Sequence, residues 1–76
     1  MQLLPPLQNA MQIVVNGESA SVSEGLSLAQ LVAELRLGAQ RLAIELNGDI
    51  VPRSRWPEVR LNPGDRAEIV RAIGGG

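Results

Sequence analysis

The sequence predicts an α+β fold in which a mixed sheet of four or five strands carries one main helix on one face. Three segments support this prediction: an alternating apolar strand pattern at 11–16, a helical apolar stripe within 27–37, and a second strand pattern at 66–72. A hairpin, one helix and further strands in this order favour a helix packed across a mixed sheet. The first and last strands carry the strongest patterns, so we expect them side by side in its centre.

The predicted domain starts with a hairpin. Residues 11–16 place Met11, Ile13 and Val15 on one face, which is typical of a half-buried strand. Asn16 and Gly17 follow as the strongest short hairpin signal, because both residues tolerate the positive φ that a two-residue turn needs. Residues 19–23 then form the returning strand, a weaker pattern because serine replaces β-branched residues.

A helix is predicted over roughly residues 27–37. Ser27 and Gln30 have the spacing of a capping box, in which each side chain bonds the other residue's backbone N–H. Apolar residues then recur at i, i+3, i+4 and i+7, which gives one stripe: Leu28, Leu31, Val32 and Leu35. We expect Gly38 to end the helix in the left-handed conformation.

The second half of the chain predicts further strands. Residues 42–47 alternate apolar and polar side chains and lead into a second Asn-Gly turn signal. A short strand at 50–51 is stopped by Pro52, and residues 53–58 form an arginine-rich loop. After a turn that contains Pro and Gly, residues 66–72 form the last strand. The whole order corresponds to a β-grasp topology.

The two ends of the chain are expected to differ from the domain at 11–73. Residues 1–10 form a leader that we expect to be flexible, because Pro5 and Pro6 favour an extended, solvated start. Met11 is a candidate natural start of the protein. The alternative is an ordered arm whose apolar side chains cover part of the domain: Leu3, Leu4 and Leu7.

Several function classes are excluded by composition. The chain has no Cys, His or Lys, so it lacks thiolates, the commonest general base and the usual zinc ligands. Its formal net charge of −1 gives no electrostatic footprint for nucleic acid or for an anionic membrane. Neither a secretory signal nor a membrane span is present, so the cytoplasm is the expected compartment. The reactive chemistry must therefore be simple or belong to a partner.

The sequence ends in three glycines, Gly74, Gly75 and Gly76, which specify no helix or strand. The functional interpretation is a slender, flexible tail that passes through a channel too narrow for side chains and presents the Gly76 carboxylate. A carboxylate becomes a good acyl donor only after adenylation, and this chain has no ATP site. The alternative interpretation is an inert terminus.

Two surfaces are candidates for docking a partner. Trp56 has two interpretations: a structural residue that fills a gap at the sheet edge, or a docking residue that contacts a partner. The structural interpretation is favoured. Arg53 and Arg55 are expected to be exposed and to touch a partner. If Ala67 and Ile69 point into the core, the last strand and its continuation leave apolar surface beside the tail: Val70, Ala72 and Ile73.

Three stretches carry a resemblance to a known family. They are I-V-V-N-G-E at 13–18, L-N-G-D-I-V-P-R-S-R-W at 46–56 and G-D-R-A-E-I-V-R-A-I-G-G-G at 64–76. The chain resembles the ThiS family, the ubiquitin-like sulfur carriers of thiamine thiazole biosynthesis. The resemblance covers residues 11–76 and implies a β-grasp fold; residues 1–10 depart from the family pattern.

The resemblance implies a carrier acted on by partner enzymes, with no catalytic residue, metal or bound cofactor of its own. An E1-like, ThiF-like adenylyltransferase uses ATP and Mg²⁺ to adenylate Gly76. A persulfide donor such as a cysteine desulfurase then converts Gly76 to a thiocarboxylate, and a ThiG-like thiazole synthase takes the sulfur. Three alternatives remain: a carrier for another product such as molybdopterin, a ubiquitin-like modifier of proteins, and an interaction module with an inert tail.

Overall fold

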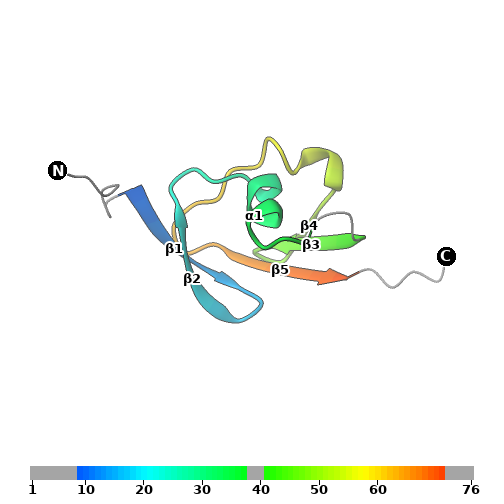
Figure 1. Ribbon diagram of the computed structural model, residues 1–76. Helices are drawn as coiled ribbons and strands as arrows, with labels where there is room; N and C mark the ends of the chain where they lie inside the picture. Colours follow the sequence, from blue (N-terminus) through cyan, green and yellow to red (C-terminus); the bar gives the residue numbers. More distant parts are fainter. Residues whose placement is uncertain (1–8, 38–40, 72–76) are drawn as a thin grey trace.

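The computed structural model describes residues 9–37 and 41–71. It contains a five-stranded mixed sheet with one α-helix on one face (Figure 1). Along the described chain, the elements are β1 Ala10–Val15, β2 Glu18–Ser23, α1 Leu28–Glu34, β3 Leu42–Leu46, β4 Asp49–Val51, the 3₁₀ helix η2 Arg53–Arg55 and β5 Arg66–Arg71. No described helix has the length and apolar character needed to cross a membrane.

The strand order β2-β1-β5-β3-β4 confirms the predicted β-grasp topology. The first and last strands, β1 and β5, are central neighbours and run parallel, while the other pairs are antiparallel. The helix connects the hairpin to the second half of the sheet and packs across it (Figure 1). A parallel central pair needs such a crossover connection, because a short turn joins only antiparallel strands.

Both predicted Asn-Gly turns are confirmed. Asn16 and Gly17 have φ values of 51° and 85°, and Asn47 and Gly48 have φ values of 51° and 93°. Positive φ at both central residues is the signature of a type I′ turn, whose twist matches that of the strands it joins. The turns set the registers of the β1–β2 and β3–β4 hairpins.

The predicted start of the helix is confirmed. The Ser27 side chain accepts a hydrogen bond from the Gln30 backbone N–H at 3.1 Å. The Gln30 side chain accepts one from the Ser27 N–H at 2.9 Å, which completes the capping box. These bonds satisfy two of the N–H groups that have no partner within the helix.

The predicted end of the helix is wrong. The helix ends at Glu34, and Arg36 takes the left-handed position with φ 60°, where Gly38 was expected. The Arg36 N–H donates to Ala33 O at 3.1 Å and the Leu37 N–H to Val32 O at 3.3 Å, the two bonds of a Schellman motif. The early turn allows Leu37 to pack against the core. Gly38 itself lies outside the described residues.

The core lies between the helix and the sheet face that it covers. Its most deeply buried large side chains are Ile13, Leu28, Leu31, Ile44 and Leu61. Three of the four residues of the predicted helical stripe are buried, but Leu35 is 42% exposed. Leu35 leaves the stripe because it caps the helix C-terminus, where the chain turns away into the left-handed residue.

Candidate functional site

The candidate site is the glycine tail together with the strand that leads to it. The expected reactive residue Gly76 and the rest of the tail and its root lie outside the described residues: Ala72, Ile73, Gly74 and Gly75. Strand β5 is the last described element before them. The structure therefore describes two parts of the site: the contacts that hold β5 in place and the surface that β5 presents.

The side chain of Asn16, in the β1–β2 turn, holds β5 on one side. Its Oδ1 accepts a hydrogen bond from the Ile69 N–H at 2.7 Å, and its Nδ2 donates to Ile69 O at 3.2 Å. The Asn16 backbone N–H also donates to Ala67 O at 2.9 Å. The amide thus pairs with both backbone groups of Ile69 beyond the point where the parallel β1–β5 pairing ends.

The side chain of Asn47, in the other turn, holds the start of β5 from the opposite side. Its Oδ1 accepts from the Arg66 N–H at 2.9 Å, and its Nδ2 donates to Asp65 Oδ1 at 3.0 Å. The other oxygen of Asp65 accepts from the Asn62 N–H at 2.8 Å, which closes the preceding turn. The strand that leads to the tail is therefore fixed by both hairpin turns.

We expect Asn16→Gly to destabilise the protein by about 1–3 kcal/mol, because it removes both side-chain bonds to β5. Glycine accepts the positive φ of this turn, so the hairpin itself is retained. Asn16→Asp is the matched variant, which keeps the acceptor for the Ile69 N–H and loses the donor. Urea unfolding measures the loss, and amide exchange at Ile69 localises it; unchanged stability and exchange in Asn16→Gly would contradict this role.

The face of the sheet opposite the helix carries Val70, the one residue of the predicted apolar surface that lies within the described residues. Ala67 and Ile69 are buried and Val70 is 55% exposed, which confirms the predicted alternation along β5. Val70 lies opposite Ala43 in the β3–β5 register. Ile50 of β4 is 67% exposed and, like these two residues, lines a small depression of about 90 Å³. We call Ala43, Ile50 and Val70 the open-face patch.

Two carboxylates border the open-face patch. Glu45 and Glu68 are direct partners in the β3–β5 register and line the same depression. Because like charges directly opposite each other destabilise a sheet, Glu45 and Glu68 do not stabilise the fold. They make the border of the patch negatively charged. The described residues, 9–37 and 41–71, contain no group of three or more acidic, Cys or His side chains that could hold a metal.

The arginine-rich loop begins immediately after β4. Trp56 is 4% exposed and its Nε1–H donates to Val51 O at 2.9 Å, which confirms the structural interpretation of this residue. The Arg53 guanidinium lies 5.0 Å from the centroid of the Trp56 ring. Arg55 Nε lies 3.3 Å from Glu58 Oε2, but both side chains are mostly exposed, so this ion pair adds little stability. Arg53 and Arg55 are exposed as predicted, and their docking role stays a prediction.

Sequence reasoning missed two features of this site. It treated Asn16 and Asn47 only as turn residues, although the asparagine amide has a separate donor, Nδ2, and acceptor, Oδ1, that can pair with the backbone of a neighbouring strand. The use of asparagine in both turns was the available signal. It also missed Ala43 and Ile50, because the register that brings them beside Val70 is a long-range property.

Comparisons with known proteins agree with the fold. The family model described as "ThiS family" matches residues 7–76, which include the glycine tail. The sulfur carrier protein ThiS of Escherichia coli (strain K12) is 29% identical over 66 residues, 87% of this chain and 100% of that protein. The crystal structure of a thiamine biosynthesis protein (ThiS) from Geobacter metallireducens has a TM-score of 0.77 and 30% identity, and covers 87% of this chain and 100% of that one.

A longer relative is also similar. A protein named thiazole synthase from Paramagnetospirillum magneticum (strain ATCC 700264 / AMB-1) is 41% identical over 66 residues, which are 87% of this chain. The match spans only 20% of that protein. A segment similar to this chain therefore forms one part of a larger polypeptide.

Proposed function

This chain belongs to the ThiS family of sulfur carriers, and we propose that it carries sulfur on Gly76 for the thiazole of thiamine. The observation that carries the proposal is the family match over residues 7–76, which extends through the tail to Gly76. The match to the whole length of the Escherichia coli sulfur carrier supports it. The expected compartment is the cytoplasm, where ATP is supplied.

The proposed cycle starts on a partner, an E1-like adenylyltransferase. A Gly76 carboxylate oxygen attacks the α-phosphorus of ATP, in the presence of Mg²⁺, and pyrophosphate leaves. The terminal sulfur of a persulfide, formed on a cysteine by a desulfurase, then attacks the acyl carbon and AMP leaves. A second thiol cleaves the resulting S–S bond, which releases the Gly76 thiocarboxylate and leaves a disulfide on the donor.

In this cycle the folded body docks and the tail reacts. The two asparagine side chains fix β5, the last described strand before the tail. Glycine has no Cβ, so three successive glycines enter a narrow channel in extended or unusual backbone conformations. Binding energy from the body thus places the Gly76 carbonyl carbon against the reagent, which lowers the entropic cost of the reaction.

The proposed acceptor of the sulfur is a thiazole synthase. The support is the relative of that name, in which a segment similar to this chain forms 20% of the polypeptide. The fusion of two proteins in one chain is expected when they act in the same reaction. A carrier for molybdopterin is the rival within this class. If growth of a strain that lacks this protein is rescued by thiamine and not by molybdenum cofactor, that rival is excluded.

We propose that the open-face patch docks the adenylyltransferase, with Arg53 and Arg55 as further contacts. Val70→Asp should weaken this complex at least about tenfold, because it places a charge in a desolvated interface. It should lower stability by no more than about 1 kcal/mol, a loss set by the poorer strand propensity of Asp, because Val70 is 55% exposed. Calorimetric titration and urea unfolding measure the two effects. Equal losses in both would mean that Val70 supports the core.

The test of the function is the intact mass of the protein. The protein is incubated with ATP, Mg²⁺, an E1-like adenylyltransferase, a cysteine desulfurase and cysteine. Replacement of one oxygen by sulfur at the C-terminus is the expected result. Covalent adducts on lysines of other proteins would indicate a modifier instead, and an unchanged mass with a competent adenylyltransferase would indicate an inert tail.

A further inference from the structure

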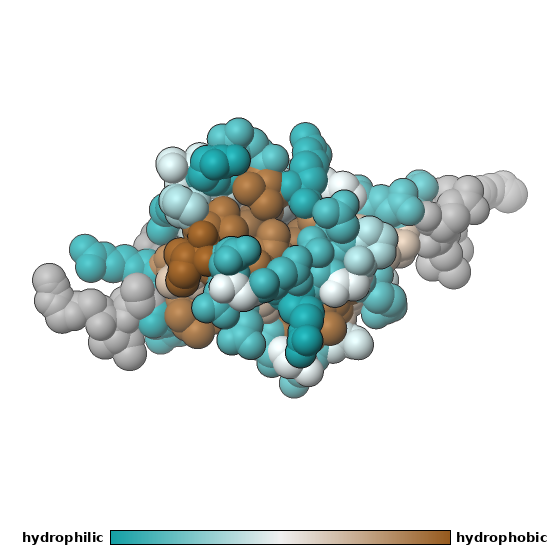
Figure 2. Space-filling view, turned by 180° about the vertical axis from the view of Figure 1, so that it is seen from behind, coloured by the Kyte–Doolittle hydropathy of each residue, from teal (hydrophilic) through white to brown (hydrophobic). Residues whose placement is uncertain are grey.

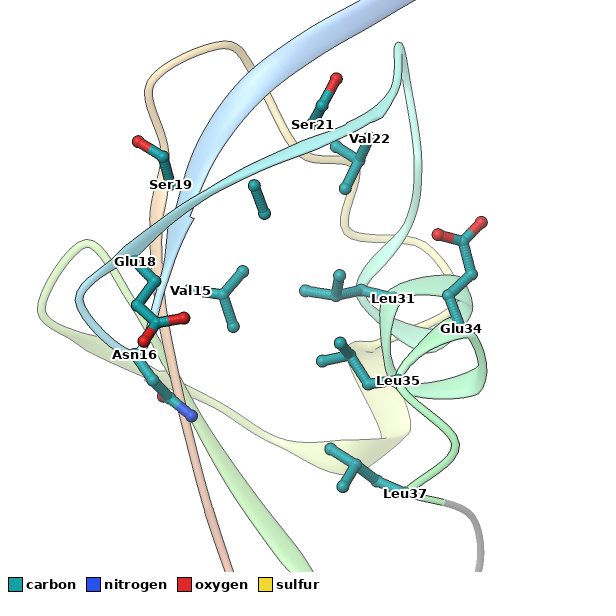
Figure 3. A pocket seen from close by; sticks show the side chains of 11 residues that line it. Val15, Asn16, Glu18, Ser19, Ser21, Val22, Leu31, Glu34, Leu35 and Leu37 are labelled. Carbon is teal, nitrogen blue, oxygen red and sulfur yellow. The ribbon is translucent and has the colours of Figure 1, made fainter.

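A second surface, on the helix side of the sheet, has no part in the proposed cycle. It is a cleft of about 620 Å³ between β2 and α1. Val15, Leu31, Leu35 and Leu37 project into it in Figure 3, and Glu18 and Glu34 are also labelled among its lining residues. Leu35, the one residue of the helical stripe that the core leaves exposed, lines this cleft. In the view from behind in Figure 2, hydrophobic side chains reach the molecular surface near the middle of the molecule, among hydrophilic ones.

The cleft borders an unpaired strand edge. Gln12 and Val14 direct backbone groups toward β5: Gln12 O accepts from the Gly64 N–H at 2.7 Å, and the Val14 N–H donates to Asp65 O at 2.9 Å. Their partners in the β1–β2 register are Ser21 and Ser19. Because hydrogen-bonded and non-hydrogen-bonded pairs alternate in an antiparallel ladder, both serines direct their N–H and C=O groups away from β1. In the described part of the chain no strand lies beyond β2.

The two edges of the sheet are protected differently. β4 has three residues and is followed by Pro52, which limits its pairing with another strand. β2 has six residues and no Lys, Arg or Pro, the residues that usually block edge pairing. Four of its six residues are Ser or Ala, so another backbone can approach it closely. The sheet is therefore open to strand addition at β2.

We propose that the β2 edge and its cleft bind an extended peptide segment of a partner protein. The segment pairs with the backbone of Ser19 and Ser21, and every second side chain enters the cleft, where apolar residues fit. Glu18 and Glu34 line the cleft, and none of its lining residues is basic, so the segment carries Lys or Arg beside its apolar residues. The ligand class is thus an alternating apolar peptide with a positive charge.

Two other occupants fit these observations less well. A second copy of the chain would bring a second set of the same carboxylates, Glu18 and Glu34, to the interface, and like charges oppose such pairing. The sequence of residues 1–8 contains Pro5 and Pro6, which have no N–H to donate to a ladder, and no basic residue. Charge complementarity therefore favours a basic segment of another protein.

The test uses a defined probe, the acetylated and amidated heptapeptide Arg-Ser-Val-Ser-Ile-Ser-Arg, in which serine alternates with the basic and apolar residues, so that these share one face of the strand. Titration into the ¹⁵N-labelled full chain should shift the amides of Ser19 and Ser21 and saturate. A second heptapeptide of the same composition, with the apolar residues contiguous, is the matched control and should bind at least about tenfold more weakly. Shifts confined to β4 and β5, equal binding of the two peptides, or no saturation at millimolar peptide would overturn the proposal.

Variants of the full chain test where on its surface the peptide binds. Leu35→Lys should weaken binding at least about tenfold, and it spares the fold because Leu35 is 42% exposed. Glu18→Arg combined with Glu34→Arg should reverse the preference, so that a probe with Glu in place of both Arg binds better. Unchanged affinities in these variants would overturn the proposal. A doubled hydrodynamic mass without peptide would overturn it in favour of a second copy, and binding that rises on deletion of residues 1–8 would identify them as the occupant.

This proposal is independent of the sulfur chemistry. A chain without Gly76 should bind the probe as tightly as the full chain, because the contacts proposed for the peptide are all with residues of the described part of the chain, on β2 and α1 and beside them. Loss of binding in that variant would show that the peptide contacts the tail and would overturn the proposed site. Failure of peptide binding would leave the mass test of sulfur transfer unaffected.

Discussion

Deletion of Gly76 should lower sulfur transfer by at least about 10²-fold, while stability stays within about 0.5 kcal/mol of the full chain. The shortened chain still ends in a glycine carboxylate, so the chemistry of the end group is unchanged. The position of this carboxylate does change, because one extended residue spans about 3.3–3.6 Å. A misplacement of about 1 Å is enough to cost two orders of magnitude when a reacting group must be aligned.

The matched variant adds one alanine after Gly76. It keeps a terminal carboxylate and moves it by the same length in the other direction, so it should fail equally. Intact mass measures the fraction of thiocarboxylate, urea unfolding measures stability, and thiamine-free growth reports the whole pathway. If either variant forms the thiocarboxylate at the rate of the full chain, the tail does not reach a fixed position in the activating enzyme.

Trp56→Ala should destabilise the protein by about 3–5 kcal/mol, since it empties a large buried site in a small domain. Trp56 is 4% exposed, and its Nε1–H is bonded to Val51 O. Domains of this kind have a total stability of about 5–15 kcal/mol, so the variant loses a large part of it. The loss should extend to partner binding because the unfolded fraction rises.

Trp56→Phe is the matched variant. It retains an aromatic ring but removes the donor to Val51 O, so we expect a smaller loss of about 1–3 kcal/mol. Arg53→Ala removes the cation near the ring and should cost at most about 1 kcal/mol. Thermal or urea unfolding ranks the three variants. A stable Trp56→Ala protein that binds its partners poorly would restore the docking interpretation of this residue.

The fold was predictable to the extent that local signals determine it. The Asn-Gly turns and the Ser27–Gln30 capping box act within four residues, and each is present as predicted. The alternation along β5 identified Ala67 and Ile69 as core residues and Val70 as exposed. These features depend on backbone conformation and side-chain period, which the sequence encodes directly.

The remaining features depend on packing between distant segments. The helix ends at Glu34 because Leu37 packs on the core after a left-handed residue, and an arginine accepts that conformation although a glycine lies two residues later. The bonds from Asn16 to Ile69 join residues 53 positions apart. Such contacts follow from the three-dimensional register of the strands, so the sequence pattern alone predicts neither of them.

The central claim is that this protein is a co-substrate whose Gly76 carries the sulfur atom. The most direct measurement starts from the protein charged with isotopically labelled sulfur and adds thiazole synthase with its other substrates. We expect the label to leave the protein and appear in the thiazole, one atom for each carrier consumed, with Gly76 returned to a carboxylate. Unlabelled thiazole formed while the label stays on the protein would contradict the claim.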